Sequence, residues 1–485
     1  MFSLLKDTLE KYGLDITKCV GDSFDGAANM SGIYNGVAAE SVASLHVHTC
    51  CYSHSLNLVL TDAAFSTTAA TTLFGVVQRV STFFKSAYKR IGVLDKTLKE
   101  RGRRFRRLVS IGETKWLSKS AALIKIFRSY SATDSTKSGL LVELIVALDT
   151  IAEEPTFHES ARSDAKFLLD NFIKFETILT AHAFLLIYKI NTPLSLYLQT
   201  KGLDMLQAWR MVETVSKEVA AISRDFESVH DKAKDFGASA NFALEELETD
   251  LEIDVALPKK RARKKKRMTG EQCQDEAVVN EVESFRINVF NAIMDRVSQN
   301  INERFLNYIK IHQDFACFDP RRFNELKRAG IPSSATNKVC ELLGDRVNRE
   351  LLRMQLESFV DSYPRLALSL PEEFEILGSG REKSEDNGDE LDEERHDVST
   401  CKENGKTCKA CFTCPYNVLH QCSLNSTAYS ELYTVYHFLL TLAITQVECE
   451  RSFSKLKLIK TRLRSTLSQQ NLDSLMLMSV ELVTF

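Results

Sequence analysis

The chain is poor in proline and glycine, and it lacks a long uninterrupted apolar run. Only 8 Pro and 19 Gly occur among 485 residues, about half the usual share of each or less. Because both residue types punctuate turns, their scarcity favours long helices over a β-sandwich with many turns. The most apolar stretch, Phe184–Tyr188, is bounded by His182 and Lys189, far short of the ~20 residues that span a bilayer. We therefore expect no membrane partner.

Features of a secreted protein are also missing. The first residues contain no cationic start, no long apolar stretch and no small-residue cleavage site, so we expect no signal peptide. The 12 cysteines are then interpreted as intracellular thiols or metal ligands and not as a disulfide framework.

Net charge is close to zero, but the charges are unevenly distributed. The total is −3, with 62 Lys and Arg against 65 Asp and Glu. Residues 381–397 contain nine acidic and three basic side chains, a composition typical of a solvated connector. Two other segments, 85–107 and 259–267, are strongly basic. A near-neutral total therefore does not exclude a nucleic-acid partner.

Hydrophobic periodicity predicts a mainly α chain. From 71 to about 362 the pattern is almost entirely helical, and a stripe at helical spacing opens this region: Leu73, Val76, Val77, Val80 and Phe84. Short β-like stretches are expected only near 16–20 and 45–51. After the acidic connector, a final helical block begins at about Tyr429.

The segment that follows Pro258 carries eight cationic side chains in nine residues. Such density cannot be buried, since each charge would need a partner. The run predicts a nuclear-import signal or a phosphate-binding segment, and the alternative is a solvated tether. We favour localisation in the nucleus. The residues are Lys259, Lys260, Arg261, Arg263, Lys264, Lys265, Lys266 and Arg267.

The second basic segment spans 85–107 and holds ten Lys and Arg against two acidic residues. Interleaved aromatic side chains make it a candidate DNA-binding surface, with an ordinary exposed helix face as the alternative. The candidate contacts are Lys85, Lys89, Arg90, Arg101, Arg103, Arg104, Arg106 and Arg107.

Two clusters could hold a metal. Cys408, Cys411 and Cys414 follow one another at CxxC spacing, so their thiolates can converge on one Zn²⁺. The second half of the usual CxxC…CxxC pattern is absent, and simple loop thiols are the alternative. His46, His48, Cys50, Cys51 and His54 are five further donors. They divide between a strand and a helix start and so favour structural roles.

Several stretches, in order along the chain, resemble the hAT (hobo–Activator–Tam3) transposase superfamily, in the branch that includes transposon-derived zinc finger MYM-type proteins. Glu448–Ser465 is the most specific, because it resembles the C-terminal block named for dimerisation. The other stretches are Cys19–Gly32, Cys51–Leu60, Phe74–Arg90 and Thr114-Lys115-Trp116.

The resemblance implies an RNase H-like α/β core interrupted by a large helical insertion. In the family, two Asp and one Glu hold two Mg²⁺ ions for DNA cleavage and strand transfer. By motif, Asp25 resembles the second Asp and Glu450 the Glu, while Trp116 resembles the insertion-domain aromatic that stacks on a flipped base. The implied segments are a partial core (1–66), the insertion with its basic linker 258–267 (67–380), an acidic and Cys-bearing linker (381–424) and the dimerisation region (425–485).

Departures from the family pattern argue against catalysis. The family's first Asp lies upstream of every motif seen here, so we expect a truncated core and a vestigial pair, Asp25 and Glu450. Two carboxylates cannot hold a metal pair, so Mg²⁺ is expected only if the site were complete. The alternative is an active hAT transposase whose N-terminal part is missing from the sequence.

The C-terminal block predicts self-association as a homodimer or homo-oligomer. Its apolar stripes could instead pack on the rest of the chain. No small-molecule substrate is expected. The candidate interface residues are Phe453, Leu456, Ile459, Leu463, Leu472 and Leu475.

Overall fold

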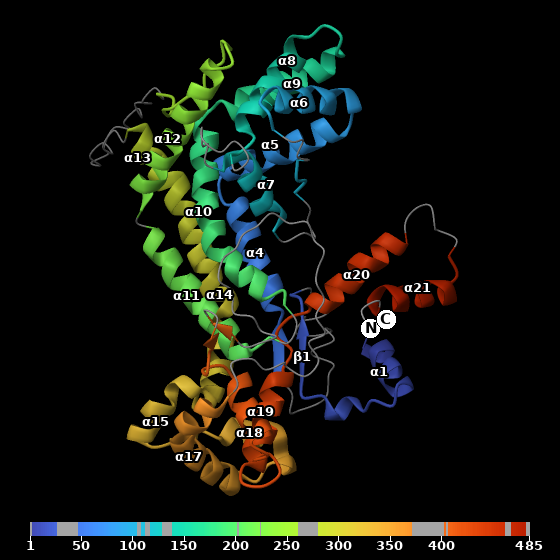
Figure 1. Ribbon diagram of the computed structural model, residues 1–485, viewed down its shortest axis with the longest axis vertical. Helices are drawn as coiled ribbons and strands as arrows, with labels where there is room; N and C mark the ends of the chain where they lie inside the picture. The colour runs from blue at the N-terminus through green and yellow to red at the C-terminus, as the bar shows by residue number, and fades with distance from the viewer. Residues whose placement is uncertain are drawn as a thin grey trace, which may run out of the picture. The chain divides into compact units, whose positions relative to one another are not determined.

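The computed structural model describes most of the chain (Figure 1), and its residues cluster into two compact units. Unit 1 combines 1–56, 193–214 and 302–485, and unit 2 combines 57–192 and 215–301. The residues described are 2–26, 47–103, 108–111, 117–128, 138–200, 203–223, 225–259, 280–370, 402–403, 406–460 and 467–481.

Helices dominate both units, so the prediction of a mainly α chain is confirmed. Four helices contain the borders between the units: α4 (Tyr52–Ala64), α10 (Phe175–Tyr197), α11 (Met205–Ile222) and α14 (Ala292–Phe315). Among the described residues, no helix has both the length and the apolar character needed to cross a membrane.

Unit 1 contains both pairs of strands and the C-terminal helices. Its further elements are α1 (Phe2–Lys11), η1 (Ile16–Lys18), β1 (Gly21–Phe24), β2 (Val47–Cys50), η3 (Ala316–Phe318), η4 (Pro320–Arg322), α15 (Phe323–Ala329), α16 (Asn337–Leu343), η5 (Gly344–Arg346), α17 (Arg349–Leu366), η6 (Ala367–Ser369), β3 (Lys402–Glu403), β4 (Lys406–Thr407), α18 (Thr413–Gln421), α19 (Ser430–Thr441), α20 (Val447–Ile459) and α21 (Gln469–Glu481).

Every secondary-structure element described in unit 2 is a helix. Its further elements are α5 (Thr68–Lys85), α6 (Tyr88–Glu100), α7 (Ser118–Phe127), α8 (Leu141–Glu153), α9 (Glu159–Phe172), α12 (Phe226–Glu245), α13 (Glu281–Phe285) and the π-helical turn η2 (Arg286–Asn291).

In the parallel pair β1–β2, the first strand begins directly after the stretch that was expected to form it. The predicted strand near 16–20 is wrong: Ile16–Lys18 forms a 3₁₀ turn, and β1 begins at Gly21, which pairs with Val47. A Cβ on Gly21 would lie 3.1 Å from the Val47 carbonyl oxygen. Because glycine has no Cβ, Gly21 permits the close approach of β1 to β2. Pairing with β2 outweighs the preference of Gly21, Asp22 and Ser23 for a turn. The strand expected at 45–51 is confirmed as β2.

The core of unit 2 follows the predicted helical stripes. All five residues of the α5 stripe, from Leu73 to Phe84, are buried. Phe74 meets Phe184 of α10 edge to face, with ring centroids 4.8 Å apart. Helix α8 packs against α9 and α6, and nine of its thirteen residues are buried. Burial of apolar side chains from several helices therefore holds this unit together.

An aromatic cluster in unit 1 joins α17 to the helices near the C-terminus. Phe359 of α17 lies edge to face with Phe323 of α15 and Tyr429, which precedes α19. Tyr436 of α19 is fully buried, and its hydroxyl donates a 2.9 Å hydrogen bond to the Phe318 carbonyl oxygen. The hydrogen bond satisfies the polar end of a side chain whose ring supplies apolar contact.

Candidate functional site

Two carboxylates from distant parts of the sequence meet in unit 1. Asp25 directly follows β1, and Glu450 lies in the first turn of α20. Burial, together with the negative charge of Asp25, raises the pKa of Glu450 from 4.5 to about 7. The structure thus brings together the two residues that the sequence singled out as a vestigial catalytic pair.

The segment before α20 is tied to both strands, which explains this convergence. The Gln446 side-chain amide donates to the Ser23 carbonyl oxygen at 2.6 Å. The Thr49 hydroxyl makes a 2.6 Å hydrogen bond to the Ala443 carbonyl oxygen, and the Tyr52 N–H reaches the Ile444 carbonyl oxygen at 2.9 Å. These bonds fix the start of α20 beside the end of β1.

A third polar side chain, His54 of α4, lies within the electrostatic influence of Asp25. Burial lowers the pKa of His54, although the Asp25 carboxylate acts in the opposite direction. Burial also raises the pKa of the Cys51 thiol to about 11, so this thiol stays neutral at physiological pH. His54 was considered as a metal donor from the sequence, but its proximity to Asp25 depends on the tertiary structure.

Asp22 of β1 and His48 of β2 form a second polar pair in this part of unit 1. Asp22 and His48 are register partners, and their Oδ1 and Nδ1 atoms lie 2.5 Å apart. Hydrogen bonds to Asp22 and Cys50 raise the pKa of His48 to about 9. An imidazolium–carboxylate pair therefore links the strands at neutral pH.

The donor set does not fit a two-metal centre. Such a centre needs several carboxylates around two ions. Among the residues the structure describes, no third Asp, Glu, His or Cys atom completes a ligand group with Asp25 and Glu450. The partly protonated Glu450 at neutral pH also weakens the attraction for a cation.

The candidate DNA-binding residues fall into two groups. Lys85, Lys89 and Arg90 lie at the end of α5 and the start of α6, around Tyr88, which is 93% exposed. Lys89 stacks over Phe157 and Arg90 over Phe83, at 4.2 and 4.3 Å from the ring centroids. These cations border an exposed aromatic ring, as a phosphate-tracking surface requires.

Arg103 and Arg101 have a different environment. Arg103 is 7% exposed and donates to the Glu143 carboxylate at 2.6 Å and to two backbone carbonyl oxygens, those of Ser138 and Gly139. Arg101 faces the same carboxylate at 3.4 Å. Assigning Arg103 to an exposed basic surface is therefore a mistake, because its charge is neutralised in the core.

Several predicted residues lie outside the described part of the chain. These are Trp116, Arg104, Arg106, Arg107, Leu463 and the basic run from Lys260 to Arg267. Lys259, which begins the run, is described and exposed.

The candidate interface residues of α20 and α21 differ in exposure. Phe453 is 69% exposed, Leu456, Ile459 and Leu475 are half-buried, and Leu472 is 9% exposed. The two helices pack on each other, with the Lys455 ammonium donating to the Ser479 carbonyl oxygen at 2.7 Å.

Three further apolar side chains of these helices face solvent: Leu458, Leu477 and Met478, at 76%, 58% and 63% exposure. The stripes predicted from the sequence included none of these three residues. Helical spacing identifies an apolar face, but it cannot show which of its side chains neighbouring helices leave uncovered.

The three cysteines of the CxxCxxC segment converge. The Sγ atoms of Cys408, Cys411 and Cys414 all lie within 4.8 Å of one another. They form the one group of metal-ligand atoms detected among the described residues.

The C-terminal part of the chain, which contains α18 to α21, is similar to a region of a known protein family. Residues 408–482 match the model of the hAT family C-terminal dimerisation region. No curated protein and no solved structure matches the chain. The predicted resemblance to hAT proteins is thus confirmed for the C-terminal segment, which carries the exposed side chains of α20 and α21.

Proposed function

We propose that the chain is a hAT transposase-derived nuclear protein that self-associates through α20 and α21, binds DNA and lacks transposase activity. The family match at 408–482 supports the first part of this proposal. The order of the other motifs supports derivation from a transposase of the zinc finger MYM-type branch, with an RNase H-like core.

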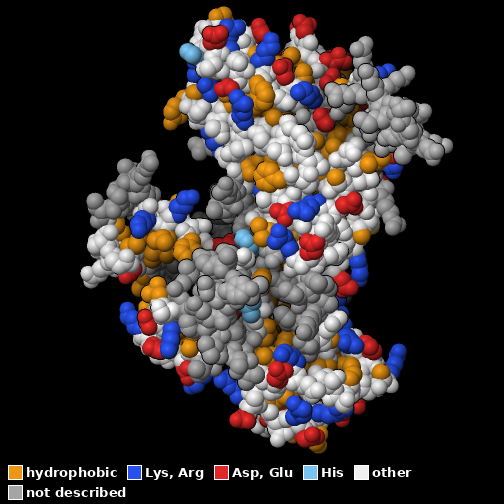
Figure 2. Space-filling model, turned by 180° about the vertical axis from the view of Figure 1, so that it is seen from behind, with side chains coloured by type: hydrophobic (Ala, Val, Ile, Leu, Met, Phe, Trp, Pro, Cys, Tyr) orange, Lys and Arg blue, Asp and Glu red, His pale blue; other side chains and the backbone are white. Residues whose placement is uncertain are grey.

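The apolar surface of α20 and α21 carries the proposal of self-association. Phe453, Leu458, Leu477 and Met478 are each more than half exposed within the matched region. Figure 2 shows hydrophobic side chains on this segment, at the left of the view. Exposed apolar side chains that gather on one helix pair favour an interface, because association removes them from water.

Light scattering at micromolar concentration tests this directly. We expect a dimer or larger assembly for the wild-type chain and a monomer for the double variant Leu458→Glu/Met478→Glu, because two buried charges would be unpaired in the interface. Met354→Glu is the matched control: Met354 is 66% exposed on α17, outside the matched region. A monomeric wild type, or equal disruption by the control, would contradict the proposal.

The carboxylate pair supports the proposal of lost catalysis. Asp25 and Glu450 meet without a third carboxylate among the described residues. A cleavage and strand-transfer assay with Mg²⁺, comparing the wild type with Glu450→Gln, should show no activity in either. Activity of the wild type that disappears in Glu450→Gln would establish the alternative, an active hAT transposase.

The cations around Tyr88 support DNA binding. We expect Lys85→Ala/Lys89→Ala/Arg90→Ala to weaken binding to a DNA duplex and to lower the salt dependence, by about 0.9 in slope per lost phosphate contact. Lys338→Ala, on an exposed lysine of α16, is the control. Unchanged binding by the triple variant would remove this surface from the proposal.

Nuclear localisation rests on the basic run that begins at Lys259. A fluorescent fusion should accumulate in the nucleus, and replacing Lys264, Lys265 and Lys266 by alanine should leave it in the cytoplasm. Substitution of Lys96 and Lys99, which are exposed on α6, controls for loss of charge alone. A nuclear triple variant would show that the run is not the signal.

A further inference from the structure

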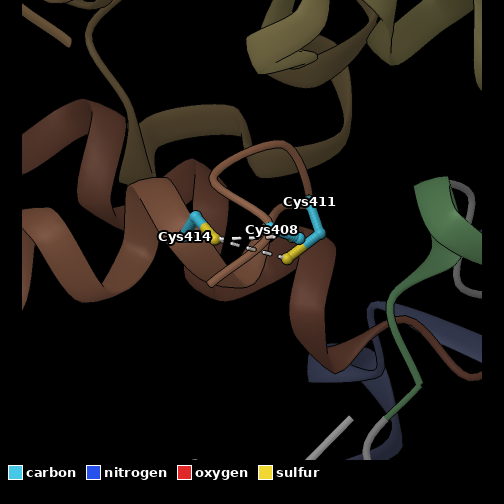
Figure 3. Close-up of side chains that lie close together, drawn as sticks. All are labelled: Cys408, Cys411 and Cys414. Carbon is cyan, nitrogen blue, oxygen red and sulfur yellow. Dashed lines mark hydrogen bonds between the residues drawn. The ribbon is translucent and has the colours of Figure 1, made fainter. Parts of the chain in front are cut away.

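The segment 408–414 brings three thiols to one point, although its cysteines occupy three different local structures. Cys408 directly follows β4, Cys411 lies in the loop, and Cys414 is the second residue of α18. Figure 3 shows their side chains turned toward one another. The Cys414 sulfur lies 3.7 Å from the sulfur of Cys408 and 3.7 Å from that of Cys411.

These distances match the edges of a metal–thiolate tetrahedron. With zinc–sulfur bonds of about 2.3 Å, tetrahedral geometry separates two sulfur ligands by about 3.8 Å. Sulfurs joined in a disulfide lie at only about 2.05 Å. We propose that Cys408, Cys411 and Cys414 bind a structural Zn²⁺ ion, an inference that does not depend on the proposed function.

The loop between the cysteines is held in place by side chains from other elements of unit 1. The Tyr363 hydroxyl donates to the Lys409 carbonyl oxygen at 2.9 Å, and the Arg210 guanidinium donates to the Ala410 carbonyl oxygen at 2.7 Å. Asp204, itself 1% exposed, accepts a 3.2 Å hydrogen bond from the Thr413 N–H. The backbone is therefore fixed on three sides, which orients the sulfurs before any ion arrives.

Local dipoles favour the thiolate form that a metal needs. The Ala410 N–H donates to the Cys408 sulfur at 3.5 Å. Cys414 sits in the first turn of the nine-residue helix α18, where the N-terminal dipole attracts negative charge. Lys409 adopts a left-handed conformation, φ 53°, which turns the chain sharply between Cys408 and Cys411.

Burial and ligand chemistry select a structural zinc ion. Cys411 and Cys414 are fully buried, and Cys408 is half-buried, so the site is closed to large reactants. Three thiolates are soft ligands, which Zn²⁺ accepts in tetrahedral geometry. Among the described residues, no fourth His, Cys, Asp or Glu atom joins the group, and we assign the fourth position to no side chain.

The ion would fasten the hairpin β3–β4 to α18 at the start of the region that matches the hAT dimerisation model. Because metal binding requires the folded loop, its free energy adds to the stability of this part of unit 1. Removing zinc should therefore lower the melting temperature of the full chain.

Metal analysis of the purified full-length chain, expressed with added zinc, tests the proposal. We expect about one zinc ion per chain for the wild type and for Cys422→Ser, and a severalfold loss for Cys408→Ser and Cys414→Ser. Cys422→Ser is the matched control, because Cys422 is an exposed thiol that directly follows α18. A wild type without zinc, or equal zinc in all four proteins, would overturn the proposal.

Cobalt substitution keeps the test decisive if the serine variants fail to fold. In the wild-type chain, Co²⁺ bound by these thiolates should give intense sulfur-to-cobalt charge-transfer absorption that zinc abolishes on titration. A wild type that shows no such band would contradict zinc binding. So would a wild type whose three cysteines at 408–414 all react as free thiols, or one in which mass spectrometry finds a disulfide between two of them.

Discussion

Helices α8 and α9 in unit 2 and helices α20 and α21 in unit 1 are both packed pairs, but they differ in what covers them. In α8, nine of thirteen residues are buried. Among the described side chains of α20 only Val447 is buried, and among those of α21 only Leu472. One pair is thus a core element, and the other leaves apolar side chains exposed to solvent.

The same contrast applies to one glutamate on each pair. Glu143 on α8 is fully buried and is neutralised by Arg103 and Arg101. Glu450 on α20 is half-buried and has the carboxylate of Asp25 as its neighbour. A structural carboxylate has a cation beside it, whereas a residue of the candidate site has a second anion.

The largest effect is expected from breaking the buried ion pair of unit 2. Arg103→Met leaves Glu143 without its closest cation and should lower the free energy of unfolding by ~3–5 kcal/mol, measured by urea denaturation. Arg103→Met/Glu143→Leu should recover much of the loss, because both charges are then gone. If the single variant were as stable as the wild type, Arg103 would belong on the surface after all.

A pair of equal truncations compares the two helix pairs directly. Leu148→Ala on α8 leaves a cavity where the leucine side chain is 0% exposed, and it should lower the free energy of unfolding by ~2–5 kcal/mol. Leu458→Ala on α20 removes atoms that are 76% exposed and should cost about 0.5 kcal/mol or less in dilute solution.

Measuring both variants at several protein concentrations tests this comparison further. If α20 forms an interface, the cost of Leu458→Ala should grow as the concentration rises, since the assembled form adds to stability. The cost of Leu148→Ala should not change. A concentration-independent loss of several kcal/mol at Leu458 would show that the chain itself covers this side chain.

A further expected effect concerns Glu450 and depends on pH. Its pKa in the folded chain, about 7, exceeds the ordinary 4.5, so the folded state binds the proton more tightly and loses stability as pH rises from 4.5 to 7. Glu450→Gln removes this loss. The variant should therefore melt at a higher temperature than the wild type at pH 8 and at a similar one near pH 4.5.

An identical melting difference at both pH values would show that Glu450 does not titrate in this range. His48 makes a useful internal reference, because its raised pKa also lowers stability as pH rises, but in a higher pH window. Its contribution is complete below pH 6.5 and is lost as pH rises through about 9. His48→Gln should therefore affect stability mainly below pH 9.

Local sequence patterns predicted helices and strands well where one face of the element is buried and the other is exposed. The stripe from Leu73 to Phe84 became the buried face of α5, and the stretch at 45–51 contains β2. The strand near 16–20 was misplaced, because pairing of Gly21 with Val47 depends on a second strand far along the chain. Asp25 and Glu450 were found by motif, while the electrostatic influence of Asp25 on His54 depends on the fold.

The helical character, the uneven charge, the CxxCxxC spacing and the likeness of the C-terminal segment to a dimerisation region follow from the sequence alone. Which charges are exposed and which thiols lie together depends on the three-dimensional fold. Arg103 and Lys89 look alike in the sequence, yet one is buried against Glu143 and the other is exposed. The reason is physical: periodicity depends on near neighbours, whereas burial and convergence depend on residues brought together from distant parts of the chain.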